Sequence, residues 1–412
     1  MRRSRAARKI RGRTRRSACR ALVACLVAAA SSPAWLHAQL TLRVSGPPVA
    51  TGAAIHVAGS FNGWNPNAPD FVPALQSDGT FALTLPDTVR GPVEFKFTLG
   101  SWETVETTVS GEDIANRAFT IPATGAATVS AVVGAWRKSS PSAPKKSTAS
   151  ASVTVLSDSF PIPQLQRTRR IWLYLPPGYA TSHRRYPVLY IQDGQNVFDA
   201  ATSFAGEWGV DETLDSLQAR GDGGAIVVAV DNDGAHRLDE YDPWINANHT
   251  YGGGEGDAYV EFLARTLKPY IDHHYRTRTD PRNTGIIGSS MGGLISLYAA
   301  LKYPGVFGRA GVFSCACWIA ESSLLAYVRA ARPHRPAPRF YFVSGEHETP
   351  SGQPAREQQH VVDALISAGV PRGSVKALTR TDGAHAEWFW RREFADAYRW
   401  MFDAPKGMHG RQ

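Results

Sequence analysis

The pattern of apolar and polar positions divides the chain into two parts. From Gln39 to about Ala135, short apolar or alternating runs are separated by Gly, Pro, Asn and Asp, without a helical period of useful length. Such closely spaced runs predict an all-β, immunoglobulin-like sandwich of about 100 residues. The expected strands are Ala53–Ala58, Thr80–Leu85, Val93–Leu99 and Ala127–Val133.

Residues 152–403 alternate apolar runs with stretches of helical period. This alternation favours a mostly parallel sheet with helices on both faces, whose ligands bind at the carboxyl ends of the strands. The expected strands are Ile171–Leu175, Val188–Ile191, Ala225–Val230, Gly285–Ile287, Gly311–Phe313, Phe340–Val343 and Val375–Leu378. The expected helices are Glu207–Gln218, Asp257–Tyr275, Met291–Tyr303, Glu321–Ala331, Gln353–Ala368 and Glu387–Phe402.

Three further segments contain little that could be buried in a core. Residues 136–151 are rich in Ser, Ala, Pro and Lys and are expected to form a flexible linker, and residues 404–412 a tail. Residues 1–38 combine a basic start, the apolar run Ala21–Ala30 and small residues up to Ala38, which predicts a secretory signal peptide cleaved after Ala38. The apolar run is about half of the roughly 20 residues that span a bilayer, so we expect a secreted or periplasmic protein without a membrane span. Lipoprotein cleavage at Cys25 is the less favoured alternative.

The net charge of +9 comes from the predicted signal peptide. Ten Lys and Arg residues lie between Met1 and Arg20, and their removal takes the net charge from +9 to −1. A basic surface for nucleic acid is therefore not expected. After cleavage Cys315 and Cys317 are the remaining cysteines. Their spacing is poor for zinc and strained for a disulfide, so we expect two buried free thiols. We expect no metal or other cofactor.

Candidate chemistry begins at the segment from Gly288 to Gly292, which fits G-x-S-x-G with Ser290 at its centre. The motif alone is weak, but an expected strand leads into it and an expected helix follows it directly. This strand–turn–helix context is that of the nucleophile elbow of α/β-hydrolases, which exposes the serine hydroxyl. The sequence therefore predicts an α/β-hydrolase fold with Ser290 as the nucleophile.

A serine hydroxyl needs a base, and His385 is the best placed of the histidines. It follows the last expected strand and precedes the final helix, at the edge where the chemistry is expected. The acid should follow the strand Phe340–Val343, where Glu346 and Glu348 share one loop. We prefer Glu348 because it stands at the tip of the loop, and Glu346 remains the alternative.

An ester hydrolase needs two backbone N–H groups to stabilise the oxyanion, the negatively charged oxygen that forms when the serine attacks the carbonyl carbon. Met291, directly after the nucleophile, is expected to supply one. The loop after the strand Val188–Ile191 should supply the other, through Gln195 or alternatively Gly194.

The segment from about Arg170 to Phe402 resembles the family described as "Putative esterase", which includes enterochelin esterases, feruloyl esterases and mycolyltransferases. The resemblance implies ester chemistry without a metal, and a pocket that includes Tyr241, Trp244 and Trp318. The sequence departs from the pattern at residues 315–317 and at Ala386, so the acyl group is not implied. The matching segments are residues 190–195, 240–244, 287–293, 307–314 and 385–390, with Trp318.

The segment from about Ile55 to Arg117 resembles starch-binding carbohydrate-binding modules. Flat aromatic rings stack on the apolar faces of sugars, while polar side chains hydrogen-bond to hydroxyls. The alternative is that the tryptophans belong to the core of the sandwich. The candidate sugar-binding residues are Trp64, Lys96, Trp102 and Asn116.

These features predict a secreted serine esterase that acts on acylated carbohydrate or a similar ester, with an N-terminal module that binds a polysaccharide. Acyl transfer to a sugar hydroxyl is a second hypothesis, because the same acyl-enzyme serves either acceptor. A glycan-binding protein with an inert hydrolase domain is a third. The presence of a full set of serine, histidine and acid candidates argues against the third.

Overall fold

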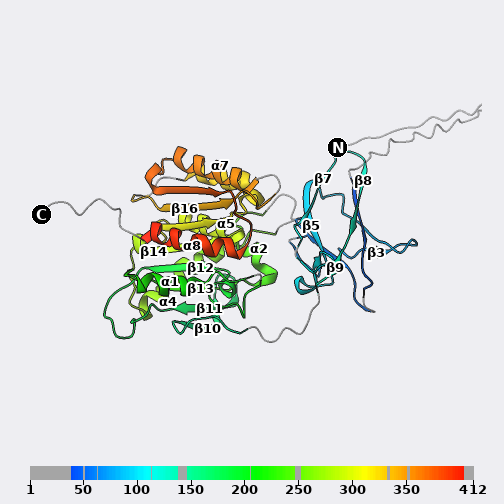
Figure 1. Ribbon diagram of the computed structural model, residues 1–412. Helices are drawn as coiled ribbons and strands as arrows, with labels where there is room; N and C mark the ends of the chain where they lie inside the picture. Colours follow the sequence, from blue (N-terminus) through cyan, green and yellow to red (C-terminus); the bar gives the residue numbers. More distant parts are fainter. Residues whose placement is uncertain are drawn as a thin grey trace, which may run out of the picture.

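The computed structural model describes residues 39–49, 52–62, 64–112, 114–137, 146–204, 206–245, 252–331, 335–349 and 353–402. The predicted signal peptide and C-terminal tail lie outside these residues, as does the middle of the expected linker. Two bodies follow one another along the described chain, an all-β body and an α/β body (Figure 1).

The α/β body is built on one eight-stranded sheet of order β10-β11-β13-β12-β14-β15-β16-β17. The pairs from β13 to β17 are parallel, whereas β10 and β11 form an antiparallel edge. The strands are β10 Val153–Ile162, β11 Arg167–Tyr174, β12 Val188–Gln192, β13 Ile226–Val230, β14 Thr284–Ser289, β15 Arg309–Phe313, β16 Arg339–Gly345 and β17 Val375–Arg380. All seven predicted strands are present, and β10 is an additional one.

Helices cover both faces of this sheet, because its central strands are apolar on both sides. Successive residues of a strand point to opposite faces, so Ile286 joins one hydrophobic cluster and Ile287 the other. Helices α1 Val210–Ala219 and α8 Glu387–Phe402 pack on the face of Ile287. The other face is covered by α3 Gly256–Phe262, α4 Lys268–His274, α5 Met291–Lys302, α6 Glu321–Ala330 and α7 Gln353–Ser367.

One predicted helix, Asp257–Tyr275, is interrupted. Its middle, Leu263–Leu267, forms a π-helical turn, η4, between α3 and α4. Pro269 lies in the first turn of α4 and has no N–H to donate to the preceding turn. Leu263 and Leu267, at the two ends of this turn, are both fully buried in the same hydrophobic cluster.

The N-terminal body is a β-sandwich whose two main sheets have the orders β3-β4-β1-β8 and β2-β5-β7. Its core consists of alternate residues from both sheets, including Leu42, Val57 and Phe95. The four predicted strands correspond to β2, β4, β5 and β8. The strands are β1 Gln39–Ser45, β2 His56–Gly59, β3 Ala74–Leu75, β4 Phe81–Thr84, β5 Gly91–Thr98, β6 Glu106–Thr107, β7 Arg117–Ile121, β8 Ala126–Val132 and β9 Ala135–Trp136.

The described ends of the expected linker are attached to the two bodies. Trp136 pairs in β9 with Glu106 of β6. On the other side, Ser147 Oγ donates to Asp199 Oδ2 at 2.8 Å and Ser150 N donates to Asp211 Oδ2 at 2.7 Å. The chain therefore reaches the α/β body before β10 begins, through a segment from Lys146 to Ser150 that we call the docking segment.

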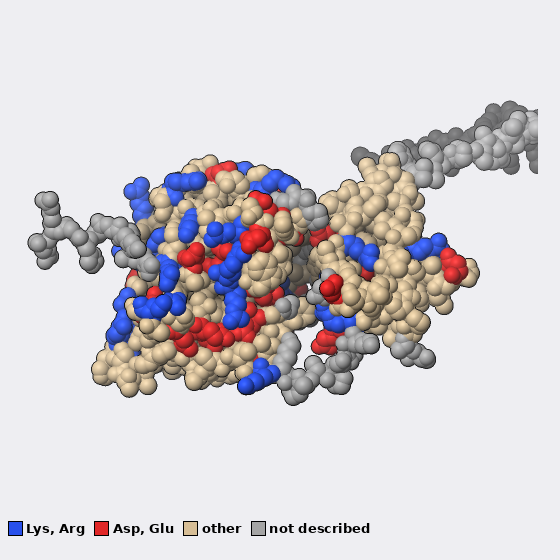
Figure 2. Space-filling model, viewed as in Figure 1, with Lys and Arg blue, Asp and Glu red and all other residues tan. Residues whose placement is uncertain are grey.

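Charged residues of both signs lie on the face of the α/β body seen in Figure 2. Figure 2 shows Lys and Arg interspersed with Asp and Glu over the α/β body, while the sandwich is mostly uncharged on this face. None of the described helices is both long and apolar enough to cross a membrane.

The sandwich contains a buried ion pair that its stability should depend on. Glu106 has a fully buried side chain, and Arg117 bonds both of its carboxylate oxygens. Arg117→Ala would leave this carboxylate buried without its counter-charge, so we expect the free energy of unfolding to fall by about 3–5 kcal/mol. Arg43→Ala is the matched control, because its pair with Asp78 is exposed to solvent and contributes little to stability. Urea unfolding of both variants measures the difference, and equal losses would contradict the interpretation.

Candidate active site

Ser290 lies in a sharp turn between β14 and α5. Its backbone has φ 56° and ψ −123°, a strained conformation for a residue with a side chain. The turn is held because Ser290 N donates to Phe313 O at 2.9 Å, and Ser290 O accepts from Ala316 N at 3.1 Å. A Cβ added to Gly288 would lie 2.5 Å from Gly292 O, so the entering strand and the leaving helix need glycine to approach this closely. This is the geometry of a nucleophile elbow.

His385 lies in the turn between β17 and α8, at the same carboxyl edge of the sheet. Its Nδ1 is 3.1 Å from Glu348 Oε2, and its ring packs edge-on against Trp390 at 5.2 Å. A carboxylate partner requires a hydrogen on Nδ1, which leaves Nε2 able to accept a proton. Within the described residues His385 and Ser290 Oγ are not hydrogen-bonded. Catalytic hydrogen bonds are often long in enzymes without substrate and tighten in the complex.

The carboxylate of Glu348 is fully buried and bonded at both oxygens. Oε1 accepts from Ser314 Oγ at 2.7 Å and from Gly345 N at 2.5 Å, while Oε2 faces His385. Ser314 in turn accepts from Trp390 Nε1 at 2.8 Å. The structure thus brings Glu348 to His385. Glu346 is exposed, and its backbone N–H donates to Arg380 O at 2.9 Å.

The loops that carry Glu348 and His385 are joined through their backbones. His347 N donates to Gly383 O at 3.0 Å, and a Cβ added to Gly345 would lie 2.1 Å from the same oxygen. Only glycine at position 345 permits this approach. The separation of the acid and the histidine is therefore set by main-chain contacts.

The expected oxyanion donors come from two neighbouring strands. Met291 is the first residue of α5, where helix N–H groups have no intrahelical partner. Gln195 and its alternative Gly194 lie in the short 3₁₀ turn η2, Gly194–Asn196, directly after β12. Because β12 pairs with β14, both backbone segments lie at the same edge of the sheet.

Sequence reasoning missed the residues that hold the segment from Asp193 to Asn196, which we call the oxyanion loop because it contains the expected second oxyanion donor. Asp193 precedes Gly194 in a left-handed conformation, with φ 56°. Its carboxylate accepts two hydrogen bonds from Arg237, at 2.7 and 2.8 Å, and one from Asn232 Nδ2 at 2.6 Å. In the sequence, the Asp193–Gly194 pair was the available signal for this turn. The position of Arg237 depends on the tertiary fold and has no such local signal.

The three residues implied for the pocket occupy different environments. Trp244 is half-buried and packs edge-on against Tyr298 and Tyr327, with ring centroids 5.4 and 5.9 Å apart. Trp318 is half-buried in the 3₁₀ turn η6, Cys317–Ala320. Tyr241, by contrast, is fully buried, and its hydroxyl accepts from Asp193 N at 3.2 Å. Tyr241 therefore supports the oxyanion loop from the core and does not line an open pocket.

The prediction of two free thiols is wrong, because Cys315 and Cys317 form a disulfide. The chain turns after β15, with Ser314 at φ 43°, and this turn brings the two Cα atoms to 5.1 Å, within disulfide range. The bridge encloses Ala316, whose N–H holds Ser290 O, and directly follows Ser314, which holds Glu348.

The candidate sugar-binding residues of the sandwich are partly gathered. The rings of Trp64 and Trp102 lie 6.2 Å apart, and both are half-buried outside the hydrophobic core of the sandwich. Lys96 lies in β5 opposite Ala58 of β2. Asn116 is exposed and donates to Glu94 Oε2 at 3.1 Å.

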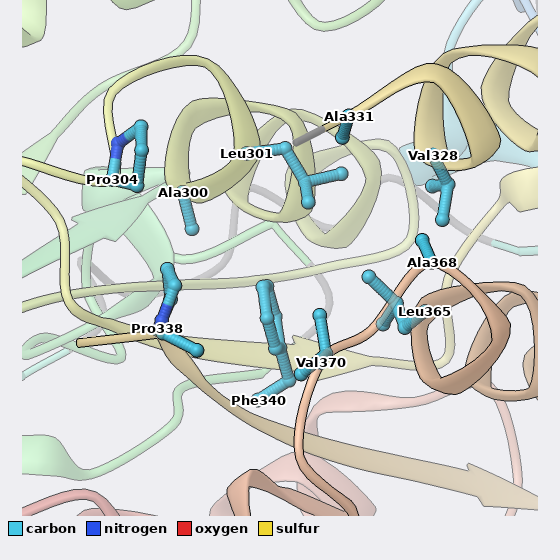
Figure 3. A pocket seen from close by; sticks show the side chains of 11 residues that line it. Ala300, Leu301, Pro304, Val328, Ala331, Pro338, Phe340, Leu365, Ala368 and Val370 are labelled. Atoms are coloured by element: carbon cyan, nitrogen blue, oxygen red, sulfur yellow. The ribbon is translucent and has the colours of Figure 1, made fainter. Parts of the chain in front are cut away.

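The α/β body has two further features, an apolar cavity and a cluster of acidic residues. Figure 3 shows a cavity between α5, α6, α7 and β16 whose lining, including Leu301, Val328 and Phe340, is apolar throughout. It offers no nucleophile or acid and lies at the amino ends of the strands. Among the described residues, the group that could hold a metal is Glu207, Asp211 and Glu212, with oxygens within 4.8 Å of one another. Burial raises the pKa of each of these three carboxyls.

The fold and the elbow define the class: this is an α/β-hydrolase with a serine at the nucleophile position. The family model described as "Putative esterase" matches residues 162–401, and the chain belongs to this family of serine hydrolases.

The chain is also similar to two other proteins in sequence and to one solved structure in fold. The "Uncharacterized protein YbbA" of Bacillus subtilis is 26% identical over 243 residues, which are 57% of this chain and 92% of YbbA. An "Alpha-amylase" of Niallia circulans is 43% identical over 100 residues, 24% of this chain but 8% of the amylase. The siderophore hydrolase EstA from Aspergillus nidulans superimposes with a TM-score of 0.51 at 15% identity, covering 64% of this chain and 98% of EstA, which supports the fold.

Glu346 and Glu348 lie in the loop after β16, which we call the acid loop. Because only the carboxylate of Glu348 contacts His385, substitution of the two glutamates should affect kcat differently. Glu348→Gln should lower kcat by about 10³–10⁴-fold, because an amide at this position holds the imidazole in the wrong tautomer. Glu346→Gln is the matched control and should change kcat little, since its side chain is exposed. Steady-state kinetics on a p-nitrophenyl ester measures both, and the reverse ranking would assign the acid to Glu346.

Proposed function

We propose that the chain hydrolyses carboxylic esters through an acyl-enzyme on Ser290. The observation that carries the proposal is the meeting, at one sheet edge, of the strained Ser290 elbow and the His385–Glu348 pair. Membership of the esterase family supports the same chemistry.

The reaction follows from these positions. Ser290 Oγ attacks the ester carbonyl while His385 Nε2 takes its proton, and Glu348 stabilises the resulting imidazolium. The N–H groups of Met291 and Gln195 would bind the oxyanion. The alcohol then leaves with the proton from His385, and water repeats the sequence to release the acid and restore Ser290. A sugar hydroxyl in place of water would give acyl transfer.

We further propose that the ester is carried on a carbohydrate that the sandwich binds. Trp64 and Trp102 present two neighbouring rings outside the core, and aromatic faces of this kind stack on sugars. The 100-residue similarity to an α-amylase, an enzyme named for a starch-type substrate, supports an α-glucan as the ligand.

We also propose that the protein acts outside the cytoplasm. The basic and apolar start of the chain supports export. The Cys315–Cys317 disulfide is in keeping with an oxidising compartment.

Removal of the nucleophile tests the esterase proposal. Ser290→Ala should lower kcat on p-nitrophenyl esters by about 10⁴-fold or more while leaving the thermal unfolding midpoint nearly unchanged. Ser289→Ala is the matched control. It removes the hydroxyl of the residue next to Ser290, which lies on β14 before the elbow. Near-wild-type turnover of the Ser290 variant would disprove the assignment. Product analysis with and without maltose as acceptor separates hydrolysis from transfer.

A pull-down tests the glycan proposal. Trp64→Ala combined with Trp102→Ala should reduce retention on granular starch, since each lost aromatic contact typically costs about 1 kcal/mol. Cellulose is the control matrix, and Trp388→Phe, a change at an exposed tryptophan of α8, is the control variant. Equal retention of the double variant and the wild type would remove the starch-binding role.

A further inference from the structure

Phe204 is a large apolar side chain that the α/β body leaves exposed. Its exposed fraction is 62%, although apolar rings of this size are usually buried. The ring contacts Trp102 of the sandwich edge-on, with centroids 6.4 Å apart and planes at 82°. Trp102 in turn neighbours Trp64 at 6.2 Å. Trp102 therefore neighbours one aromatic ring of the sandwich and one of the α/β body, and we call the group of Trp64, Trp102 and Phe204 the aromatic row.

The end of the aromatic row at Phe204 is fastened to the oxyanion loop. Phe204 N donates to Asn196 Oδ1 at 3.0 Å, and Asn196 directly follows Gln195. Thr202 Oγ1 donates to Gln195 O at 2.8 Å. The row thus runs from the proposed sugar-binding tryptophans to the loop that is expected to bind the oxyanion.

The connection between the two bodies begins and ends beside the same row. Arg137 Nη1, at the end of the described sandwich, donates to Trp102 O at 3.2 Å. Thr148 of the docking segment donates its N–H to Asp199 Oδ1 at 3.1 Å, and its hydroxyl accepts from Ala200 N at 2.8 Å. The segment of residues 199–204 therefore binds the incoming chain at its start and carries Phe204 at its end. Both ends of the connection favour placing the sandwich at the catalytic edge of the sheet, where Figure 1 shows it beside α2, Arg237–Glu240.

We propose that the aromatic row is one extended glycan-binding site that feeds the active site. A polysaccharide chain stacked on Trp64 and Trp102 continues over Phe204, and an acyl group on a nearby sugar hydroxyl reaches Ser290. The substrate class is then an ester on a glucan chain, bound by both bodies at once. This inference rests on the proposed function and goes beyond it, because the sandwich would present the scissile ester and not merely anchor the enzyme.

The test compares one acyl group on two alcohols. For the mature full-length protein, kcat/KM is measured on p-nitrophenyl acetate and on acetylated maltoheptaose, and the ratio of the second to the first is the readout. Phe204→Ala should lower this ratio by about two- to tenfold, as expected for one lost aromatic contact. Leu75→Ala is the matched control. Leu75 is 66% exposed in β3, and Figure 1 shows β3 on the side of the sandwich away from the α/β body, so its loss should leave the ratio unchanged.

The outcomes separate this inference from the proposals that it rests on. If Trp64→Ala weakens starch retention but Phe204→Ala keeps the wild-type ratio, the sandwich is only an anchor and the inference is overturned. If the wild-type protein is not retained on starch, the glycan proposal itself fails. Substitution of Phe204 by Tyr, which keeps an aromatic face, should restore most of the ratio, whereas Leu should not. Equal rescue by Leu would indicate a purely apolar contact between the domains and would overturn the inference.

Discussion

The candidate active site depends on the burial of one carboxylate, that of Glu348. A carboxylate taken out of water is costly unless hydrogen bonds replace its hydration. Here Ser314 Oγ, Gly345 N and His385 Nδ1 supply those bonds. Because these donors lie at or after the ends of three different strands, satisfying this one group draws together the ends of β15, β16 and β17. The histidine is oriented as a consequence.

The strained turn at Ser290 depends on the same region. Its carbonyl is held by Ala316 N, inside the small ring that the Cys315–Cys317 disulfide closes. The residue just before that ring is Ser314, which contacts Glu348. One short segment after β15 therefore supports both Ser290 and Glu348. Backbone strain persists only where surrounding contacts over-determine it, and this segment supplies such contacts.

Much of the fold could be predicted from the sequence because the relevant signals are local. Alternating and continuous apolar runs predicted every strand of the α/β body except β10, and the glycines around Ser290 indicated the elbow. What could not be predicted depends on tertiary structure. The role of Ser314 requires the approach of β15 to the acid loop, and the pairing of Arg237 with Asp193 joins residues 44 positions apart. Strand β10 carries polar residues on an antiparallel edge, so it lacks the continuous apolar run that identifies a buried strand.

The choice between Glu346 and Glu348 shows where local reasoning ends. The two residues share one loop, and composition cannot separate them. They differ because Gly345 approaches Gly383 too closely for any Cβ, which fixes the path of the loop and points one carboxylate inward.

The same holds for the junction between the two bodies. A Ser- and Pro-rich linker predicts independence, but hydrogen bonds from Ser147 and Thr148 to Asp199 tie the end of the connection to the loop of Phe204. A short connection attached at this edge raises the effective concentration of one body at the other. The position of the attachment, more than the composition of the linker, therefore determines whether the two bodies can act on one substrate chain.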